Sequence, residues 1–203
     1  MQTALKTVPP HARGSVRTLT ARELPLFREH MLRLDRESRR DRFNGSLDDN
    51  FLARYAMQCV SDGTIIIAYF EDGVVRGAAE LHQPDLTPGS LPEIAFSVET
   101  CIRRQGVGSL LFARLIEKAR SLNYESLRIT TGSQNDAMRA LANKFGARLS
   151  FRHGESTGTI DLKQAPALEA TAASPLDITR ALLDYNRTCW GLVLKMYGLG
   201  KAS

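Results

Sequence analysis

Two glycines that follow a pair of arginines are the residues best suited to chemistry in this chain, in the run Arg103-Arg104-Gln105-Gly106-Val107-Gly108. The run lies between a segment rich in strand formers, 93–98, and a segment with apolar residues at helical spacing, 107–122. Glycines at such a joint allow backbone conformations that a side chain would forbid, so that successive N–H groups can converge on a phosphate at the helix start. The arginines add full positive charge to the partial charge of the helix end. The spacing therefore predicts a phosphate-binding loop; the alternative is a tight turn into a buried helix, without a ligand.

The residues around the two glycines distinguish between three kinds of nucleotide-binding loop. No Lys-Ser or Lys-Thr follows Gly108, which excludes the phosphate loop of the NTPases. A dinucleotide fingerprint needs a third glycine where this chain has Leu111, and its strand runs almost directly into the first glycine, whereas residues 99–105 intervene here. What remains is the pattern Arg-x-x-Gly-x-Gly between a strand and a helix.

The elements that must position this loop follow from hydrophobic periodicity and turn signals. Between the first strand and a β-hairpin we expect two helices, the second of which begins near Ser46. The first arm of that hairpin is continuously apolar, which predicts burial on both of its faces. The expected strands and helices lie at 16–19, 24–34, 46–59, 64–70, 74–81, 93–98, 107–122, 127–131, 135–145, 149–153 and 157–162.

The loop pattern and this order of elements resemble the GNAT acetyltransferase superfamily, from about Val16 to Leu162. The resemblance implies an α/β fold with a mixed, mostly antiparallel central sheet flanked by helices, and acetyl-CoA as the cofactor. The segment 135–147 is similar to the second cofactor segment of the family, in which Asn135 and Gly146 match. The family often has a tyrosine in this segment, which is a candidate general acid for the departing thiolate. This chain has Ala142 at that position.

The resemblance also implies which residues contact acetyl-CoA. Main-chain groups of the motif strand would meet the pantetheine arm and the acetyl group, and the loop and both helix starts would meet the remainder. Lys144 is a further basic candidate for the phosphates. The predicted cofactor-binding residues are Phe96, Ser97, Val98, Arg103, Arg104, Gln105, Gly106, Val107, Gly108, Ser109, Asn135 and Arg139.

A carboxylate should act as the base, because an amine with a pKa around 10 is protonated near neutral pH and only its lone pair attacks a thioester. Glu93 is the first candidate, since the family often places the base at that end of the motif strand, and Glu80 is the substitute. For Glu93 the alternative is a solvent-facing carboxylate. The resemblance implies direct transfer to an amine acceptor, without a covalent enzyme intermediate.

The acceptor stays open between protein lysine, polyamine and small amine. The arginine-rich segment 33–42 lies between the two expected helices, where the family builds its acceptor wall. Ser38-Arg39-Arg40-Asp41-Arg42-Phe43 looks like the corresponding segment of some bacterial protein-lysine acetyltransferase domains. A mixed-charge segment is, however, more often a solvated face.

Composition is typical of a folded protein with an anionic ligand. The chain has 203 residues and a formal net charge of +5, which suits coenzyme A and is also common in weak nucleic-acid binders. No apolar run could span a bilayer and residues 1–17 lack a signal-peptide core, so we expect a cytoplasmic protein. The three cysteines, Cys59, Cys101 and Cys189, have no histidine at metal-ligand spacing and predict reduced thiols without a metal site.

Changes in composition divide the chain into four parts. Residues 1–15 predict a flexible arm, 16–163 the acetyltransferase domain, 164–175 an Ala-, Pro- and Thr-rich linker, and 176–203 a helical extension. Apolar residues recur every three or four positions in the extension, which predicts that it docks on the core or on a second copy as a homodimer contact.

Two other functions remain open alongside amine acetylation. A noncatalytic acyl-CoA sensor would retain the cofactor loop, and Ala142 and the extension favour it. A nucleic-acid-binding module would use the arginine cluster, but the chain has neither an aromatic stacking set nor a recognition-helix motif.

Overall fold

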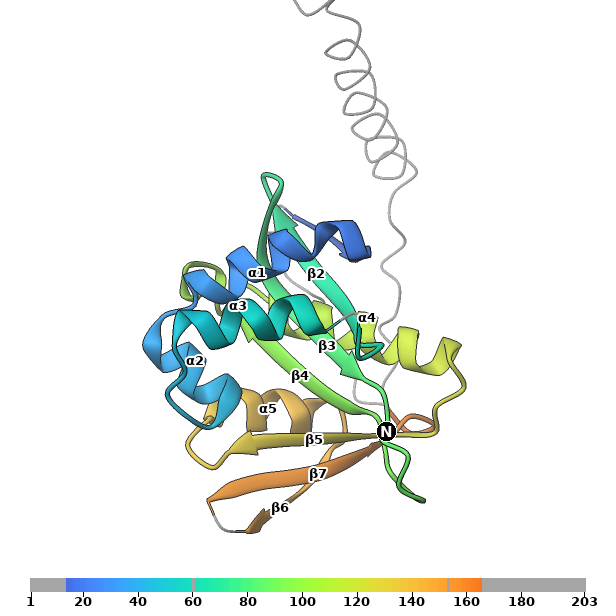
Figure 1. The fold of residues 1–203 in the computed structure, drawn as a ribbon. Coiled ribbons are helices and arrows are strands. Elements are labelled where there is room, and N and C mark those ends of the chain that lie inside the picture. Colours follow the sequence, from blue (N-terminus) through green and yellow to red (C-terminus); the bar gives the residue numbers. More distant parts are fainter. Residues whose placement is uncertain (1–13, 60, 153, 166–203) are drawn as a thin grey trace, which may run out of the picture. The chain divides into compact units, whose positions relative to one another are not determined.

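A single mixed sheet organises the computed structural model, which describes residues 14–59, 61–152 and 154–165 (Figure 1). Within these residues seven strands follow the order β1-β2-β3-β4-β5-β7-β6. β4 and β5 are parallel and every other neighbouring pair is antiparallel, which confirms the predicted fold class. The strands are β1 (Ser15–Thr18), β2 (Ile65–Glu71), β3 (Val74–His82), β4 (Glu93–Val98), β5 (Ser126–Gly132), β6 (Arg148–Arg152) and β7 (Glu155–Asp161).

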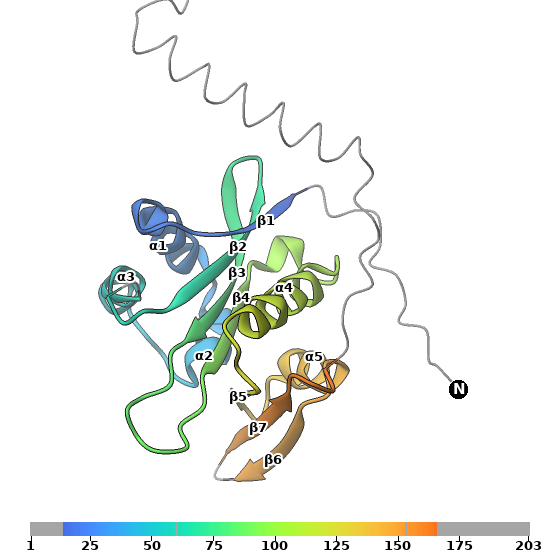
Figure 2. The same ribbon diagram turned by 90° about the vertical axis from the view of Figure 1, so that its right-hand side faces the viewer.

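Helices cover both faces of the sheet. Figure 2 shows α1 and α3 on one face and α4 on the other. None of the helices in the described part of the chain combines the length and apolar character that a membrane crossing requires. The helices are α1 (Leu24–Arg33), α2 (Arg36–Phe43), α3 (Asp49–Gln58), α4 (Val107–Ser121) and α5 (Asp136–Lys144), with short 3-10 turns at Ala21–Glu23 and Thr100–Ile102.

The segment between β1 and β2 contains three helices, so the expectation of two was wrong. The arginine-rich segment is itself the helix α2. The Asp35 side chain caps its start by accepting a hydrogen bond from the Ser38 N–H (2.7 Å), and Asn44 ends it in the left-handed conformation, with φ of 51°. Ser38 is the only buried residue of α2. Hydrophobic periodicity therefore could not reveal this helix.

Three stacked aromatic rings connect the two predicted cofactor segments. The ring of Phe96 on β4 stacks on that of Phe112 on α4, with centroids 4.7 Å apart, and Phe112 stacks on Phe145, which follows α5, at 4.4 Å. Phe112 is fully buried, as are its neighbours Leu111 and Leu115 on α4. This apolar contact holds α4 against β4 and against the end of α5.

The predicted N-terminal arm and the C-terminal tail lie almost entirely outside the described residues. Residues 1–13 and 166–203 lie outside the described part, so the predicted linker and helical extension are not described. The observed start of the first strand also differs from the predicted one, because β1 begins at Ser15, one residue before the expected start.

Candidate functional site

The site is built around a gap between β4 and β5. The Glu99 N–H donates to the Arg76 carbonyl on β3 (2.9 Å), and hydrogen-bonding direction alternates along an antiparallel strand. The peptide groups of Phe96 and Val98 consequently face β5. Among the described residues, however, β5 pairs only with the first two residues of β4. The two strands separate there, and the peptide groups of Phe96 and Val98 face an opening instead of a partner strand.

A cavity of about 380 Å³ fills this opening. It extends from β4 to the glycine loop and the two helix starts, so it brings together most of the predicted cofactor-binding residues. Gln105, Val107 and Arg139 do not line it. Its lining residues are Ser38, Asp41, Arg42, Phe96, Ser97, Val98, Ile102, Arg103, Arg104, Gly106, Gly108, Ser109, Asn135, Ala137, Met138, Ala140, Leu141 and Lys144.

The glycine loop has the conformation that an anion site needs. Gly106 is the N-cap of α4 with φ of 85°, and Arg104 also has a positive φ, 62°. The first N–H groups of α4 have no partner within the helix, and the helix dipole places partial positive charge there. A Cβ on Gly108 would lie 3.4 Å from a Leu141 side-chain carbon, at the cavity wall. The loop therefore fits the phosphates of an acyl-CoA.

Two basic side chains at the cavity are held by neighbours. The Arg103 guanidinium donates to the Val98 carbonyl (3.1 Å) and to the Ser38 hydroxyl (2.6 Å), and Lys144 donates to Ser109 (2.9 Å). These contacts fix positive charge beside β4 and beside the start of α4. Both charges could balance phosphate.

The three predicted residues that do not line the cavity have other contacts. Arg139 donates to the Ser133 carbonyl (3.0 Å) and to Asp136 (2.8 Å). Gln105 donates to the Cys101 carbonyl (3.2 Å), and Val107 is buried in the core.

Asn135 lines the cavity and also starts α5. Its side-chain oxygen accepts from the Met138 N–H (2.9 Å), which caps the helix, and its amide nitrogen lies 3.5 Å from the Asp41 carbonyl oxygen. The oxygen is therefore used for the fold. The amide nitrogen carries two N–H groups, so one of them could meet a ligand.

A second cavity, of about 390 Å³, adjoins the first and shares Asp41 and Arg42 with it. Three carboxylates line it: Asp41, Glu93 and Glu155. Its wall also carries Phe43, Tyr55, His82 and Thr131. The Thr131 hydroxyl is buried and has no hydrogen-bond partner among the described residues. An amine could enter here beside the opening in the sheet.

The two candidate bases have different environments. Glu93 lines the second cavity, one third of its side chain is exposed, and Arg128 pairs with it at 2.9 Å. Glu80 is fully buried and lines neither cavity. Its oxygens accept from Arg42, at 2.9 and 3.2 Å, and from the Tyr55 hydroxyl. Of the two carboxylates, Glu93 is the one that a substrate can reach.

Glu80 is the centre of a buried polar cluster that sequence reasoning missed. Burial alone would raise the pKa of Glu80, but the charges of Arg42 and His82 and the hydrogen bonds from Tyr55 and Arg42 together outweigh burial and lower that pKa. The Tyr55 hydroxyl lies 3.5 Å from the His82 imidazole, and burial lowers the pKa of His82. Arg42, Tyr55 and His82 come from α2, α3 and β3 and share no motif, so no local signal could have identified the cluster.

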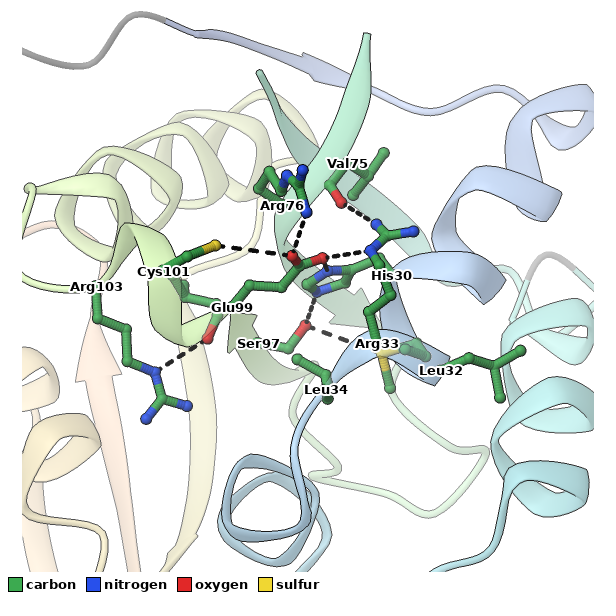
Figure 3. A network of polar contacts seen from close by, with 12 residues as sticks. His30, Leu32, Arg33, Leu34, Val75, Arg76, Ser97, Glu99, Cys101 and Arg103 are labelled. Carbon is green, nitrogen blue, oxygen red and sulfur yellow. Dashed lines mark hydrogen bonds and ion pairs between the residues drawn. The ribbon is translucent and has the colours of Figure 1, made fainter. Parts of the chain in front are cut away.

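A second buried cluster lies at the other end of β4, around Glu99 (Figure 3). His30 donates or accepts through Nδ1 at 3.1 Å from Glu99, while Arg33 and Arg76 donate to the same carboxylate at 3.0 and 2.8 Å. Burial would raise the pKa of Glu99, but these hydrogen bonds hold it at about 2. The other ring nitrogen of His30, Nε2, lies 2.9 Å from the Ser97 hydroxyl.

Several solved structures share this fold. The GNAT domain of S. lividans PAT has a TM-score of 0.62 at 19% identity, over 73% of this chain and 90% of that one. A phosphinothricin acetyltransferase from Sinorhizobium meliloti, in complex with acetyl-CoA, has a TM-score of 0.57 at 18% identity, over 80% and 97%. Ribosomal-protein-alanine N-acetyltransferase from Brucella melitensis has 0.55 at 20% identity, over 71% and 96%. No curated protein matches the sequence.

The sequence itself matches a family model. Residues 28–147, more than half of the chain, match the acetyltransferase (GNAT) family. The matched region begins in α1 and ends after α5, so it contains the glycine loop, the opening between β4 and β5, and both cavities apart from Glu155. The chain belongs to the acetyltransferase (GNAT) family.

Proposed function

We propose that this protein is an N-acetyltransferase that moves the acetyl group of acetyl-CoA directly to an amine. The observation that carries the proposal is the opening between β4 and β5, with its cavity that leads to the glycine loop. The S. meliloti structure of the same fold holds acetyl-CoA. Family membership and a fitting site support the same donor here.

The residues present would hold this donor along the whole cavity. Main-chain N–H groups at Gly106–Ser109 would bind the pyrophosphate, with Lys144 as a balancing charge. The peptide groups of Phe96 and the N–H of Val98, which face the opening, would pair with the amides of the pantetheine arm, while the Val98 carbonyl already accepts from Arg103. When bound, acetyl-CoA supplies an activated thioester. A β4 N–H would stabilise the negative charge that develops on the carbonyl oxygen.

The second cavity would take the amine. Asp41, Glu93 and Glu155 make the wall of this cavity negatively charged. The positive charge of Arg42 does not neutralise them, because Glu80 already pairs with that arginine. An ammonium group is attracted there, and Glu93 would remove its proton before attack. Thr131 would supply a hydroxyl for the acceptor.

The fold alone does not select between a protein lysine and a small amine. The two relatives with named acceptors act on a ribosomal protein and on phosphinothricin, yet their TM-scores are nearly equal. The acceptor must therefore come from a screen. Full-length protein would be given acetyl-CoA with lysine peptides, polyamines and small amines, while release of free CoA is measured.

A noncatalytic acyl-CoA sensor is the second candidate, and Ala142 favours it. This residue is fully buried and lines neither cavity, so it offers no acidic group for the departing thiolate. Tight binding of acetyl-CoA by calorimetry, without amine-dependent CoA release on any acceptor, would favour the sensor. Amine-dependent release would establish the transferase.

A further inference from the structure

Ser97, His30 and Glu99 form a chain of hydrogen-bonding groups that amine acetylation does not use. The Ser97 Oγ lies 2.9 Å from His30 Nε2, and His30 Nδ1 lies 3.1 Å from a Glu99 oxygen (Figure 3). A hydroxyl, an imidazole and a carboxylate in this order are the components of an activated serine nucleophile. β4 supplies Ser97, Glu99 follows it directly, and α1 supplies His30.

The groups around Ser97, His30 and Glu99 indicate where the protons of this hydrogen-bonded series lie. Glu99 is ionised, because it accepts hydrogen bonds from Arg33 and Arg76 as well as from the imidazole. His30 is fully buried, and burial lowers its pKa, so the ring is neutral. A neutral ring donates one N–H, and only Nδ1–H satisfies the carboxylate. Nε2 is therefore an acceptor, and the Ser97 hydroxyl donates to it.

Ser97 has access to the place where a thioester would lie. It lines the first cavity, between Phe96 and Val98, whose peptide groups face the opening in the sheet. Glu80 and Ala95 are cross-strand partners, so their side chains share a face of the sheet, and Ser97 lies two residues further along the same strand. The Ser97 side chain thus points to the face that carries α1 and the Glu80 cluster.

We propose that Ser97 is a second acetyl acceptor within the enzyme, which gives it a slow acetyl-CoA hydrolase activity when no amine is bound. In the first step His30 Nε2 takes the hydroxyl proton, Ser97 Oγ bonds to the acetyl carbon, and the C–S bond breaks. The departing sulfur takes the proton from His30, which replaces the acid that Ala142 lacks. In the second step His30 takes a proton from water, the water oxygen bonds to the acetyl carbon, and Ser97 Oγ leaves with that proton. The products are acetate and free CoA.

The charges around Glu99 indicate that this activity is slow. Arg33 and Arg76 already balance the carboxylate, so Glu99 has less charge left to stabilise an imidazolium on His30. A weakly basic histidine takes the serine proton slowly. Amine transfer through Glu93 should therefore outcompete hydrolysis whenever an acceptor is present.

The proposal rests on acetyl-CoA binding in the first cavity, and the experiment separates the two. Full-length protein is saturated with acetyl-CoA without amine, after calorimetry has measured binding for each variant. The reaction is stopped with acid and the protein is mapped by mass spectrometry, while release of free CoA is followed separately. We expect one added acetyl group on Ser97 that hydroxylamine removes, as it removes esters but not the amides of acetylated lysines.

Matched variants assign the label to its residue. Ser97→Ala should lose the label and reduce amine-independent CoA release at least tenfold, while Ser156→Ala, an equally buried serine on β7 outside both cavities, should retain both. Cys101→Ala should keep the label, which excludes a thioester on the cysteine whose sulfur lies 4.0 Å from Glu99. His30→Gln should also lower the label; Ser97→Ala tests the proposal if that variant does not fold.

Two results would overturn the proposal. An unlabelled Ser97 in protein that binds acetyl-CoA would refute the acetyl-serine and leave the transferase intact. CoA release by Ser97→Ala at the wild-type rate would have the same effect. Absence of acetyl-CoA binding would overturn the proposed function as well.

Discussion

At the scale of single residues, burial decides what each carboxylate can do. Glu80, Glu93 and Glu99 lie on or beside neighbouring strands, but two of them are buried in ion pairs and one faces a cavity. A buried carboxylate whose oxygens are already occupied cannot accept a proton without breaking its contacts. Of these three carboxylates, Glu93 is the one that lines a cavity and is open to a substrate.

Replacement of Glu93 tests that assignment. We expect Glu93→Gln to lower amine-dependent turnover by roughly two to four powers of ten, the usual effect of losing a positioned base, with little change in CoA affinity. Steady-state rates and calorimetry measure the two effects. Glu125→Gln, an exposed surface change, is the control. Near-normal turnover by Glu93→Gln across the pH range would transfer the role to His82, to a bound water or to the substrate.

Glu80 should behave as a structural residue. Glu80→Gln removes the partner of the buried Arg42 charge, so we expect it to lower the free energy of unfolding by about 3 kcal/mol, in the range for a broken buried pair. Denaturant unfolding followed by circular dichroism measures this. A variant of normal stability that has lost turnover would mean that Glu80 acts in catalysis through Tyr55 instead.

Glu99 should make stability depend on acid pH. Its pKa is about 2 in the folded protein against an ordinary 4.5, so its contribution is complete above pH 4.5 and is lost as the pH falls toward 2. Each pKa unit is worth about 1.4 kcal/mol. We expect Glu99→Gln to be less stable than wild type at pH 7 and to differ less from it at pH 3. Equal pH dependence of unfolding in both proteins would contradict this.

Among the elements, the joint between β4 and α4 shapes the first cavity. Gly106 adopts a left-handed conformation and Gly108 leaves room at the cavity wall, so this turn exposes the N–H groups of the helix start. The stacked rings of Phe96, Phe112 and Phe145 hold α4 against β4 and against the end of α5. Three elements therefore fix the position of the loop.

Gly108→Val should fill the cavity without disturbing the core. The new Cβ meets only a flexible Leu141 side chain at 3.4 Å, and the two methyl groups would project where the pyrophosphate binds. We expect at least a tenfold loss of CoA affinity by calorimetry, with circular dichroism spectra unchanged. Gly45→Val, at a glycine outside both cavities, is the matched control. Unchanged affinity of Gly108→Val would remove the loop from the donor site.

At the scale of the whole molecule, the sheet consists of two antiparallel parts, β1 to β4 and β5 to β7, which a single short parallel pairing joins. Because that pairing ends after two residues, the parts separate and leave an opening at the middle of the sheet. The first and second cavities, which share Asp41 and Arg42, both lie beside this opening. The sheet topology therefore places the two cavities next to each other.

Removal of the tail tests the role of the predicted extension. Both cavities lie between Ser38 and Glu155, and Arg120 contacts the carbonyls of Leu162 and Ala165, so a truncation after Ala167 keeps every described contact. We expect unchanged CoA affinity together with a lower Tm or an altered mass in solution, because the apolar stripe predicts docking. Calorimetry, thermal unfolding and light scattering measure these. Loss of CoA binding would show that the tail completes the site.

Features that depend on residues close together along the chain could be predicted from their order and type. The strand 93–98, the glycine joint and the helix after it lie within one continuous segment, and their signals are backbone freedom and apolar spacing. Those signals carry the family resemblance, which implied the fold class and twelve cofactor-binding residues, nine of which line the first cavity. The same signals failed for α2, whose single buried residue leaves no apolar pattern.

Contacts between polar groups far apart in the chain could not be predicted in this way. Sequence spacing cannot show that Ser97 touches His30, or that Arg42 pairs with Glu80 across 38 residues. Nor can it show that Arg139, within a matching segment, donates to its own helix start instead of the cavity. Burial and pairing depend on how strands and helices pack, and packing determines both pKa and access. The burial of Glu80 and the Ser97 cluster therefore became visible only in three dimensions.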